Sequence, residues 1–364
     1  MSQLLLSPLN DAHVALGAKF AEFSGWNMPL QYGGIVAEHN AVRQAVGIFD
    51  VSHLGKAEVL GEGALEFANN CLTNDLNRIQ DGQAQYTLIC DDEAGVVDDL
   101  IAYRVSADEI FLIPNAGNTA EVVRRLSQAA PAGIQVVNRH WDYAVVAVQG
   151  PRAAEVLAAV NLPSDLGYMS FVRGVYLDDA VSVCRTGYTG ELGYELVVPK
   201  ANALALWEQL LVAGKPFGLT PAGLGARDTL RTEMGYPLHG HELSTSVNAL
   251  EAQVGWAVGF AKEAFWGAGV LREIKAAGGP SRKLWGLKSL GKGIPRPGMG
   301  VLSDSGETIG EVTSGTFSPT LNVGIALAFL SSALTLGDRV NVQVRSRVEP
   351  FEVVKPPFVP SRVR

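Results

Sequence analysis

Residues 187–195 combine three evenly spaced glycines, an aromatic ring and a carboxylate, which together suit the binding of a planar heterocycle. Glycine lets the backbone turn tightly or approach a ligand closely, because it has no Cβ. Tyr188 offers a flat face for stacking, and Glu195 offers a carboxylate for amidine-type N–H donors such as those of a pterin. The G-x-x-G-x-x-G spacing and the strand-like run that follows argue against a phosphate-binding loop. The alternative is a hairpin turn that simply precedes a strand.

Asp98 and Asp99 form the second candidate group. They lie in an apolar run that predicts a strand, and side chains alternate between the two faces of a strand. Asp99 therefore shares one face with Ile101 and Tyr103, whereas Asp98 points to the other. If one face lines a cavity, an aspartate there could have a raised pKa and act as a general base. The alternative is an exposed carboxylate pair at the edge of a hairpin.

Arg227 is a candidate partner for an anion. It lies four residues before Arg231 in a segment with helical periodicity, so the two guanidinium groups share a helix face. Arg227 could hold a ligand carboxylate through two parallel hydrogen bonds. Pairing within the protein, with Asp228 or Glu233, is the alternative.

The histidines invite a metal interpretation that the sequence does not support. His239 and His241 are close in sequence, but no Cys, Asp or Glu cluster completes a recognisable ligand set, and the H-E-x-x-H motif is absent. We therefore predict no metal site. No plausible nucleophilic triad surrounds His53, and we expect it to be structural or to line a cavity.

The expected secondary structure places these groups in a mixed α+β fold. Asp98 and Asp99 lie in the second arm of a long hairpin formed by residues 83–90 and 96–105. Further strands are expected at 57–60, 109–114, 143–150 and 194–198, and helices at 39–47, 63–72, 119–129, 203–212 and 224–234. After a linker at residues 276–282, a small antiparallel β-barrel or sandwich is expected from short strands at 283–289, 300–302, 311–313, 323–329 and 339–344.

Composition excludes several classes of protein. No apolar stretch approaches the ~20 residues that span a bilayer, and the N-terminus does not resemble a signal peptide, so we expect a cytoplasmic protein. The net charge of −8, without a basic run, argues against nucleic-acid binding. Residues 335–364 nevertheless carry six basic and three acidic side chains. Such a segment either docks an acidic partner or forms a solvated surface.

The motifs together resemble the glycine cleavage T-protein family, the tetrahydrofolate-dependent aminomethyltransferases. The resemblance extends over nearly the whole chain, and its carriers occur in the family order at residues 25–30, 49–53, 95–101, 148–151, 187–191, 223–231 and 313–321. It implies a three-domain, cloverleaf-like arrangement with a central folate channel and a C-terminal antiparallel β-barrel. The implied domains are residues 1–50 with 145–275, residues 51–144, and residues 283–364.

The resemblance also implies roles for individual residues. Asp99 matches the catalytic aspartate near the reacting folate nitrogens. Folate-binding positions correspond to Glu195, Arg227, Tyr188, Tyr86 and Asn115, of which the two tyrosines are ligand contacts or neighbours of contacts. The chain departs from the family at Leu54, where methionine is usual, and near Arg362, where some relatives supply an aromatic contact.

The implied reaction moves a one-carbon unit from an aminomethyl-dihydrolipoyl carrier, the lipoylated H protein, to tetrahydrofolate. The products are 5,10-methylenetetrahydrofolate, ammonia and the dihydrolipoyl carrier. One alternative is a folate-binding subunit of a sarcosine or dimethylglycine demethylating system, which would need a separate flavin partner. Another is a non-catalytic folate-binding module linked to iron–sulfur assembly. That subfamily has a Lys-Gly-Cys-type signature, whereas this chain has the sequence Arg-Thr-Gly-Tyr-Thr-Gly at positions 185–190 and keeps its aspartate pair.

Overall fold

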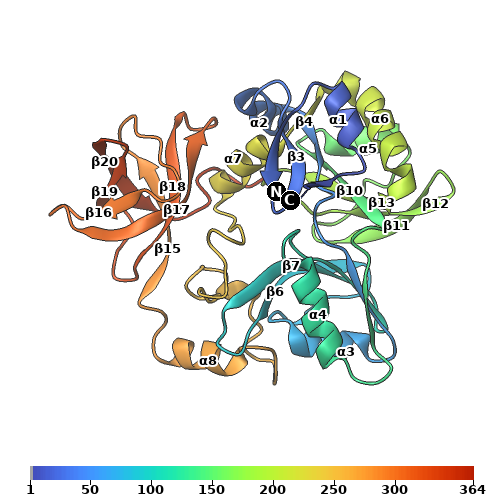
Figure 1. The fold of residues 1–364 in the computed structure, drawn as a ribbon, viewed down its shortest axis with the longest axis horizontal. Helices are drawn as coiled ribbons and strands as arrows, with labels where there is room; N and C mark the ends of the chain where they lie inside the picture. The colour runs from blue at the N-terminus through green and yellow to red at the C-terminus, as the bar shows by residue number, and fades with distance from the viewer. Residues whose placement is uncertain (1–2) are drawn as a thin grey trace.

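Three bodies of β-structure, each with its own core, make up the computed structural model, which describes residues 3–364 (Figure 1). The upper lobe in Figure 1 is built on a six-stranded sheet of order β11-β12-β13-β10-β4-β14. Its strands are β4 (Val46–Asp50), β10 (Tyr143–Gln149), β11 (Phe171–Tyr176), β12 (Asp179–Cys184), β13 (Gly193–Pro199) and β14 (Leu219–Pro221). We call it the six-stranded lobe.

The central strand β10 is an almost uninterrupted apolar run, as expected for a strand that is buried on both faces. Val146 and Val148 pack into one core, and Val145 and Ala147 pack into another on the opposite face. The lobe also contains a small sheet, and its helices surround both sheets. These elements are β1 (Leu5–Leu6), β2 (Lys19–Phe23), β3 (Trp26–Gln31), α1 (Asn10–Ala15), α2 (Ile35–Gln44), α5 (Ala153–Ala159), α6 (Ala203–Gly214) and α7 (Leu224–Met234).

The lower lobe in Figure 1 holds a five-stranded antiparallel sheet of order β6-β7-β8-β5-β9. Its elements are β5 (Ala57–Leu60), β6 (Gln83–Cys90), β7 (Val96–Ser106), β8 (Glu109–Ile113), β9 (Gln135–Asn138), α3 (Ala64–Cys71) and α4 (Thr119–Ala129). Leu100 and Ala102 face the core beside the two helices, whereas Ile101 and Tyr103 face a core shared with the six-stranded lobe. The predicted alternation along β7 is therefore confirmed.

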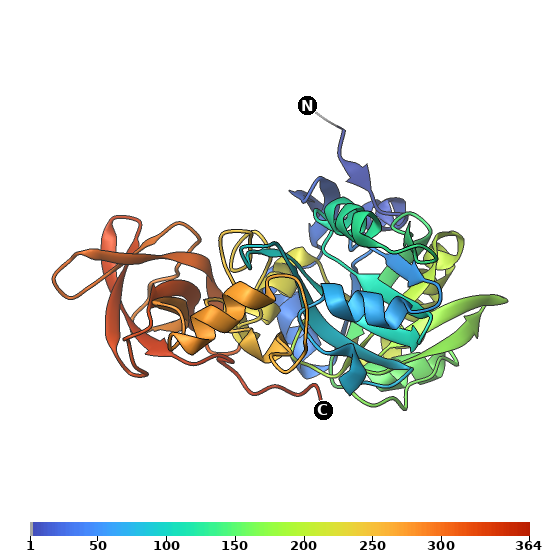
Figure 2. The same cartoon turned by 90° about the horizontal axis from the view of Figure 1, so that it is seen from below.

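The C-terminal part closes into a six-stranded antiparallel barrel of order β15-β18-β17-β16-β19-β20, which confirms the predicted barrel. Its strands are β15 (Arg282–Ser289), β16 (Gly300–Leu302), β17 (Thr308–Ser318), β18 (Val323–Ser331), β19 (Arg339–Val344) and β20 (Arg347–Val354). The predicted strand at 311–313 is the middle of the longer β17, and β20 was not predicted. After the barrel, the chain runs back to the six-stranded lobe (Figure 2), where the Arg362 N–H donates to the Gly190 carbonyl at 2.7 Å.

The connection between α7 and the barrel is more ordered than expected. It contains the short 3-10 helix η4 (Gly255–Ala257) and helix α8 (Ala268–Ala276), which the sequence analysis did not predict. Leu243, Phe265 and Leu271 from this connection form one core with Leu88 and Val96 of the hairpin β6–β7. The remaining short helices are η1 (Leu76–Arg78), η2 (Lys200–Asn202) and η3 (Lys215–Phe217). The domain boundaries given above stay a prediction.

No helix within the described residues is long and apolar enough to cross a membrane.

Candidate functional site

The two aspartates of β7 lie on opposite faces of the strand but share one amide partner. Asp98 is fully buried, and Asp99 is partly exposed. Asn115, just after β8, donates through Nδ2 to the Asp98 Oδ1 at 2.9 Å and the Asp99 Oδ1 at 2.8 Å. Asn118 donates a further bond to Asp98. The alternative of an exposed pair at a hairpin edge is wrong, because both carboxylates are held by the neighbouring loop.

Burial shifts the protonation of both carboxyl groups. Loss of water raises the pKa of Asp98 to about 7, and the charge of Asp99 adds to the rise. Burial also raises the pKa of Asp99, although hydrogen bonds from Tyr86 and Asn115 and the nearby His239 oppose it. A carboxylate with a raised pKa and no neutralising arginine or lysine can accept a proton or attract a cation. This behaviour is the one expected of a general base.

Tyr86 connects Asp99 with the solvent. Its hydroxyl donates to the Asp99 Oδ2 at 3.0 Å, and its ring stacks on Trp256 with centroids 5.2 Å apart. Burial raises the pKa of the Tyr86 hydroxyl far above its usual value, so the group stays a hydrogen-bond donor at neutral pH. Tyr86 thus orients one oxygen of Asp99, while Asn115 orients the other.

The Gly-rich segment forms the connection between β12 and β13, and its glycines make room for a side chain of the protein itself. A Cβ on Gly187 would lie 2.1 Å from the Gln149 Oε1, and a Cβ on Gly193 would lie 2.4 Å from the Gln149 Cδ. Gln149 donates to the carbonyls of Thr186 and Tyr194 and accepts from Thr189. The sequence predicted that the backbone at these glycines approaches a ligand closely. In the structure it approaches the Gln149 side-chain amide instead, and this amide fixes the shape of the loop.

Glu195 begins the apolar run of β13 and is buried. The Thr186 hydroxyl donates to its Oε2 at 2.5 Å, and no lysine or arginine within residues 3–364 forms an ion pair with it. Tyr188 precedes it on the loop, stacks on Tyr236 and donates its hydroxyl to the Pro237 carbonyl. The carboxylate is thus held in place with hydrogen-bonding capacity to spare.

Arg227, on the first turn of α7, is a partly buried cation without an acidic partner among the described residues. Its guanidinium carbon lies 4.8 Å from the centre of the Tyr188 ring, and its Nη1 has no hydrogen-bond acceptor within the described part of the chain. Burial lowers the pKa of Arg227, which the charge of Glu195 opposes. The alternative pairings are wrong: Asp228 pairs with Arg231 at 2.8 Å instead.

The electrostatic couplings show that the predicted residues lie together. Burial raises the pKa of Tyr188; Asp99 adds to the rise, whereas Arg231 and Arg227 oppose it. Burial raises the pKa of Tyr86 most, and the charges of Asp99 and Tyr188 raise it further. The structure therefore gathers residues from both lobes into one cluster: Tyr86, Asp99, Asn115, Tyr188, Glu195 and Arg227.

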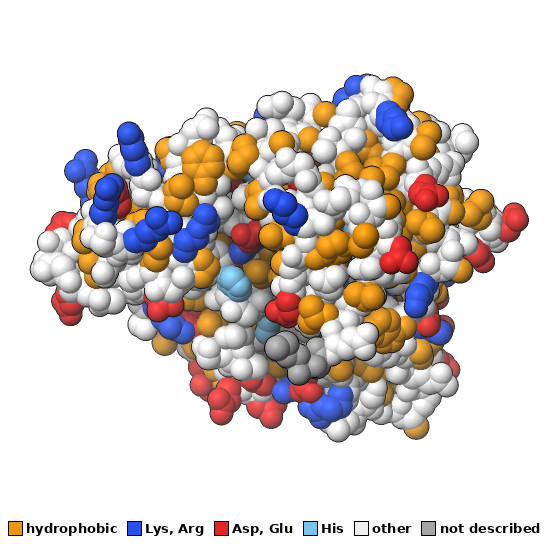
Figure 3. Space-filling model, turned by 45° about the horizontal axis from the view of Figure 1, so that its top comes forward, with side chains coloured by type: hydrophobic (Ala, Val, Ile, Leu, Met, Phe, Trp, Pro, Cys, Tyr) orange, Lys and Arg blue, Asp and Glu red, His pale blue; other side chains and the backbone are white. Residues whose placement is uncertain are grey.

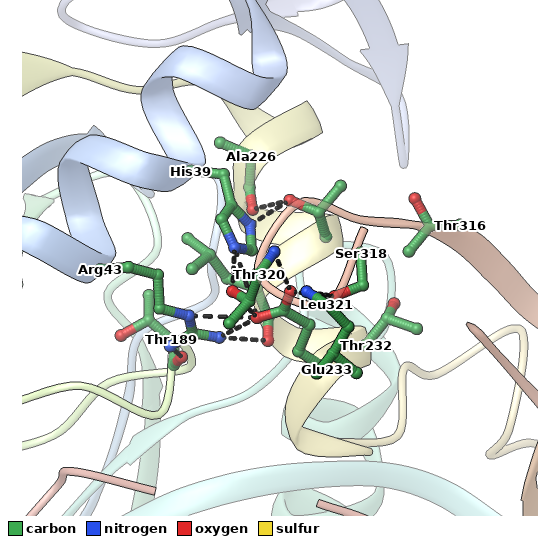
Figure 4. Close-up of polar contacts among 12 residues, drawn as sticks. His39, Arg43, Thr189, Ala226, Thr232, Glu233, Thr316, Ser318, Thr320 and Leu321 are labelled. Carbon is green, nitrogen blue, oxygen red and sulfur yellow. Dashed lines mark hydrogen bonds and ion pairs between the residues drawn. The ribbon is translucent and has the colours of Figure 1, made fainter. Parts of the chain in front are cut away.

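A second buried carboxylate, Glu233 on α7, joins the six-stranded lobe to the barrel (Figure 4). It accepts two bonds from Arg43 of α2 and bonds from the hydroxyls of Ser318 and Thr320, while His39 lies 3.3 Å away. Burial disfavours its charge, but the hydrogen bond and charge of His39, the hydrogen bond of Ser318 and the charge of Arg43 prevail and lower its pKa to about 2.

The same arginine also supports the Gly-rich segment. Arg43 donates through Nη1 to the Thr189 carbonyl at 2.6 Å and to the Glu191 Oε1 at 3.0 Å. The cluster around Glu233 therefore fixes the loop that carries Tyr188, although it contributes no group to the cluster at Asp99.

Within the described residues, no group of three or more His, Cys, Asp or Glu side chains is arranged to hold a metal ion. His239 Nε2 lies 3.2 Å from the Val96 carbonyl, and His241 Nδ1 lies 3.1 Å from the Thr313 carbonyl. His53 is buried, with its ring edge-on to Phe23.

Sequence reasoning missed Trp256, the nearness of His239 to Asp99, and Gln149. Trp256 lies in no periodic segment, so nothing local indicated its position. The apolar, strand-like surroundings of Gln149 hinted that its amide would be buried.

Comparison with known proteins follows the same division of the chain. Residues 9–262 match the GCVT N-terminal domain, and residues 282–360 match the glycine cleavage T-protein C-terminal barrel domain. An aminomethyltransferase of Frankia alni is 59% identical over all of both chains, and one of Mycobacterium tuberculosis is 56% identical over 100% of this chain and 99% of its own. The crystal structure of the glycine cleavage system aminomethyltransferase T from Bartonella henselae superposes with a TM-score of 0.93 at 35% identity, covering 99% of each chain.

These matches cover nearly the whole chain, and the chain belongs to the glycine cleavage T-protein family. Its activity is that of an aminomethyltransferase of the glycine cleavage system.

Proposed function

We propose that tetrahydrofolate is the acceptor substrate of this enzyme and that it binds at the cluster of Asp99, Glu195 and Arg227. Glu195 supplies a buried carboxylate for the amidine-type N–H groups of the pterin. The Arg227 guanidinium, which lacks an acidic partner among residues 3–364, supplies a cation for an anionic or carbonyl oxygen of the ligand. The aromatic rings of Tyr188 and Tyr86 border the same cluster.

The observation that carries the proposal is the environment of Asp99. Its two oxygens are oriented by Tyr86 and Asn115, its pKa is raised by burial, and no arginine or lysine of the described chain pairs with it. Transfer of the one-carbon unit requires a folate nitrogen to attack an electron-poor methylene, with cationic nitrogen species on the way. A carboxylate stabilises such cations and accepts the proton that the nucleophile loses. Asp99 is placed for both tasks.

The donor in this proposal is the aminomethyl-dihydrolipoyl group of the lipoylated H protein. The folate nitrogen forms a bond to the methylene carbon, and the bond from carbon to the dihydrolipoyl sulfur breaks. Ammonia leaves as the second folate nitrogen closes the ring of 5,10-methylenetetrahydrofolate. The carrier departs with a free dithiol. We further propose a cytoplasmic location, where carrier and folate meet.

A single assay tests the function. Purified enzyme, tetrahydrofolate and aminomethyl-loaded lipoyl carrier are mixed, and 5,10-methylenetetrahydrofolate and ammonia are measured together. We expect equimolar formation of both, dependent on folate. Sarcosine in place of the loaded carrier should give no product. Absence of folate-dependent product from the loaded carrier would refute the proposal, and turnover of sarcosine would point to a demethylating system.

A further inference from the structure

A large aromatic side chain lies exposed beside the site without a role in the chemistry above. Trp256 is 66% exposed and lies on η4. Its ring stacks on Tyr86 with an interplanar angle of 29°, and Tyr86 in turn donates to Asp99. A continuous line of contacts therefore leads from the solvent, through the indole and the phenol, to the proposed base.

Hydrogen bonds to Thr73 hold the turn that carries Trp256 in place. The Ala257 carbonyl accepts a bond from the Thr73 hydroxyl at 2.8 Å, and the Gly259 N–H donates to the Thr73 carbonyl at 2.8 Å. Val254, just before the short helix, and Ala257, its last residue, are buried. An exposed tryptophan on a turn held in this way presents a rigid apolar face, which binds a ligand with little loss of conformational entropy.

The chemistry of the proposed donor suits this face. The donor carries a primary ammonium on a methylene attached to sulfur, at the end of a flexible saturated arm. An indole face attracts cations and packs against thioether sulfur and methylene groups. Asp99 accepts the hydrogen bond of the Tyr86 hydroxyl and adds a negative charge, since no arginine or lysine of the described chain pairs with it.

The position of Trp256 separates it from the proposed folate anchors. Glu195, Tyr188 and Arg227 all belong to the six-stranded lobe. Trp256 instead packs on Tyr86 of β6 in the five-stranded sheet, and it is more exposed than any residue of the cluster. Its indole therefore offers an arm from the solvent a surface next to Tyr86 and outside the proposed folate anchors.

We propose that Trp256 is the platform for the aminomethyl-dihydrolipoyl arm: its indole face holds the sulfur and methylene groups of the arm next to Tyr86. This inference rests on the proposed function, because it concerns the donor of that reaction. Trp256 makes no bond in the reaction and acts by binding and positioning.

The test compares three variants of the full chain. W256A removes the platform, and W256F keeps an aromatic face. W141A is the matched control, because Trp141 is also exposed (50%) and stacks on another aromatic ring, that of Trp26, away from the site. We expect W256A to raise KM for the loaded carrier by roughly 3- to 30-fold, as for a lost cation–π and stacking contact. Its KM for tetrahydrofolate and its kcat at saturating carrier should stay within about twofold of wild type. W256F should recover most of the loss, and W141A should behave as wild type.

A binding measurement supplies a second readout that needs no turnover. Titration with free dihydrolipoamide should change the tryptophan fluorescence of wild type and of W141F, but not that of W256F. Unchanged carrier KM in a folded W256A protein overturns the inference, as does a rise in folate KM alone. A loss of kcat with both KM values unchanged also overturns it, because Trp256 would then only support Tyr86. Failure of wild type to turn over the loaded carrier refutes the proposed function instead.

Discussion

Two buried carboxylate clusters, about the aspartate pair of β7 and about Glu233 of α7, differ in what surrounds them. Asp98 and Asp99 are held by amides and a phenol, and burial raises the pKa of both. Glu233 is held by Arg43 and two hydroxyls beside His39, and its pKa falls to about 2. Burial is therefore similar at the two clusters, but the carboxyl pKa shifts in opposite directions. The pKa falls where a cation of the protein pairs with the carboxylate and rises where none does.

The difference separates a reacting group from a structural one. A carboxylate that the protein has already neutralised gains little from a further cation, and removal of its partners leaves an uncompensated charge. A carboxylate without such a partner stays available for a cation or proton that a substrate brings. The cluster at Glu233 thus joins lobe, barrel and Gly-rich loop, whereas the cluster at Asp99 can do chemistry.

The largest expected effect is on turnover. Asp99→Asn should lower kcat by roughly 10²- to 10⁴-fold, the usual contribution of a positioned base, and should leave the dissociation constant for tetrahydrofolate within a few-fold. Asp98→Asn should cost much less, because Asp98 faces the core between the five-stranded sheet and its helices. Steady-state kinetics and calorimetric folate titration measure both. Equal losses of kcat in the two variants would contradict the separation of the two faces.

The next largest effect concerns stability. Glu233→Ala leaves Arg43 and His39 without their buried carboxylate. The free energy of unfolding should fall by about 3–5 kcal/mol, as for other broken buried pairs. Chemical denaturation measures the change, and Glu121→Ala, which removes two ion pairs at the surface of α4, serves as the control. If the Glu233 and control variants lose equally little, Glu233 does not hold the barrel in place.

The two clusters should give stability slopes of opposite sign with pH. The Asp98 pKa is about 7 in the folded protein, so the folded state binds more protons and the free energy of unfolding falls as pH rises from about 4 to about 7. The lowered pKa of Glu233 has the reverse effect: its contribution is present above about pH 4.5 and is lost as pH falls to about 2.

A separate variant tests each dependence of the free energy of unfolding on pH. Asp98→Asn should flatten the upper range, and Glu233→Gln should flatten the lower one, in denaturation curves recorded across pH. One ionisable group contributes at most about 1.4 kcal/mol per pH unit. An unchanged slope between pH 4 and 7 in Asp98→Asn would show that this carboxyl is already ionised in the folded protein.

The smallest effect concerns encounter with the carrier. Lysine and arginine side chains gather on the barrel end of the face in Figure 3, and Arg345, Arg347 and Lys355 are exposed. If they attract an acidic carrier, its KM should rise a few-fold with salt, since screening acts over ~8 Å at physiological ionic strength. Replacing all three with glutamine should weaken that dependence without a change in folate binding. A carrier KM that stays flat with salt would leave these residues as a solvated surface.

The sequence predicted those parts of the molecule that carry local signals. Alternation placed Asp98 and Asp99 on opposite faces of β7, and the apolar run of residues 143–149 is the buried strand β10. The resemblance named residues that the fold gathers from both lobes. That they meet in one cluster depends on contacts between elements far apart in the chain, so no local pattern could show it.

The missed elements lack the usual signals. The hairpin β11–β12 turns at Leu177 and Asp178, which both have positive φ, where Asn-Gly or Gly is common. Helix α8 begins after Gly267, and no side chain caps it. Trp256 owes its place to the core that joins residues 243–271 to the hairpin β6–β7, and such packing leaves no trace in neighbouring residues.

We expect substitutions at Gln149, Gly187 and Gly193 to affect one another, because the three residues share one packed space. A Cβ on Gly187 or Gly193 would lie within 2.1–2.4 Å of the Gln149 amide, so the amide would have to move from its present place. An alanine at either glycine should therefore cost the bonds of Gln149 to Thr186 and Tyr194, and a shorter residue at 149 should relieve the clash. In genetic terms the loop is strongly epistatic. Single changes here should be lost from a mutant library, and survivors should carry a second change at position 149.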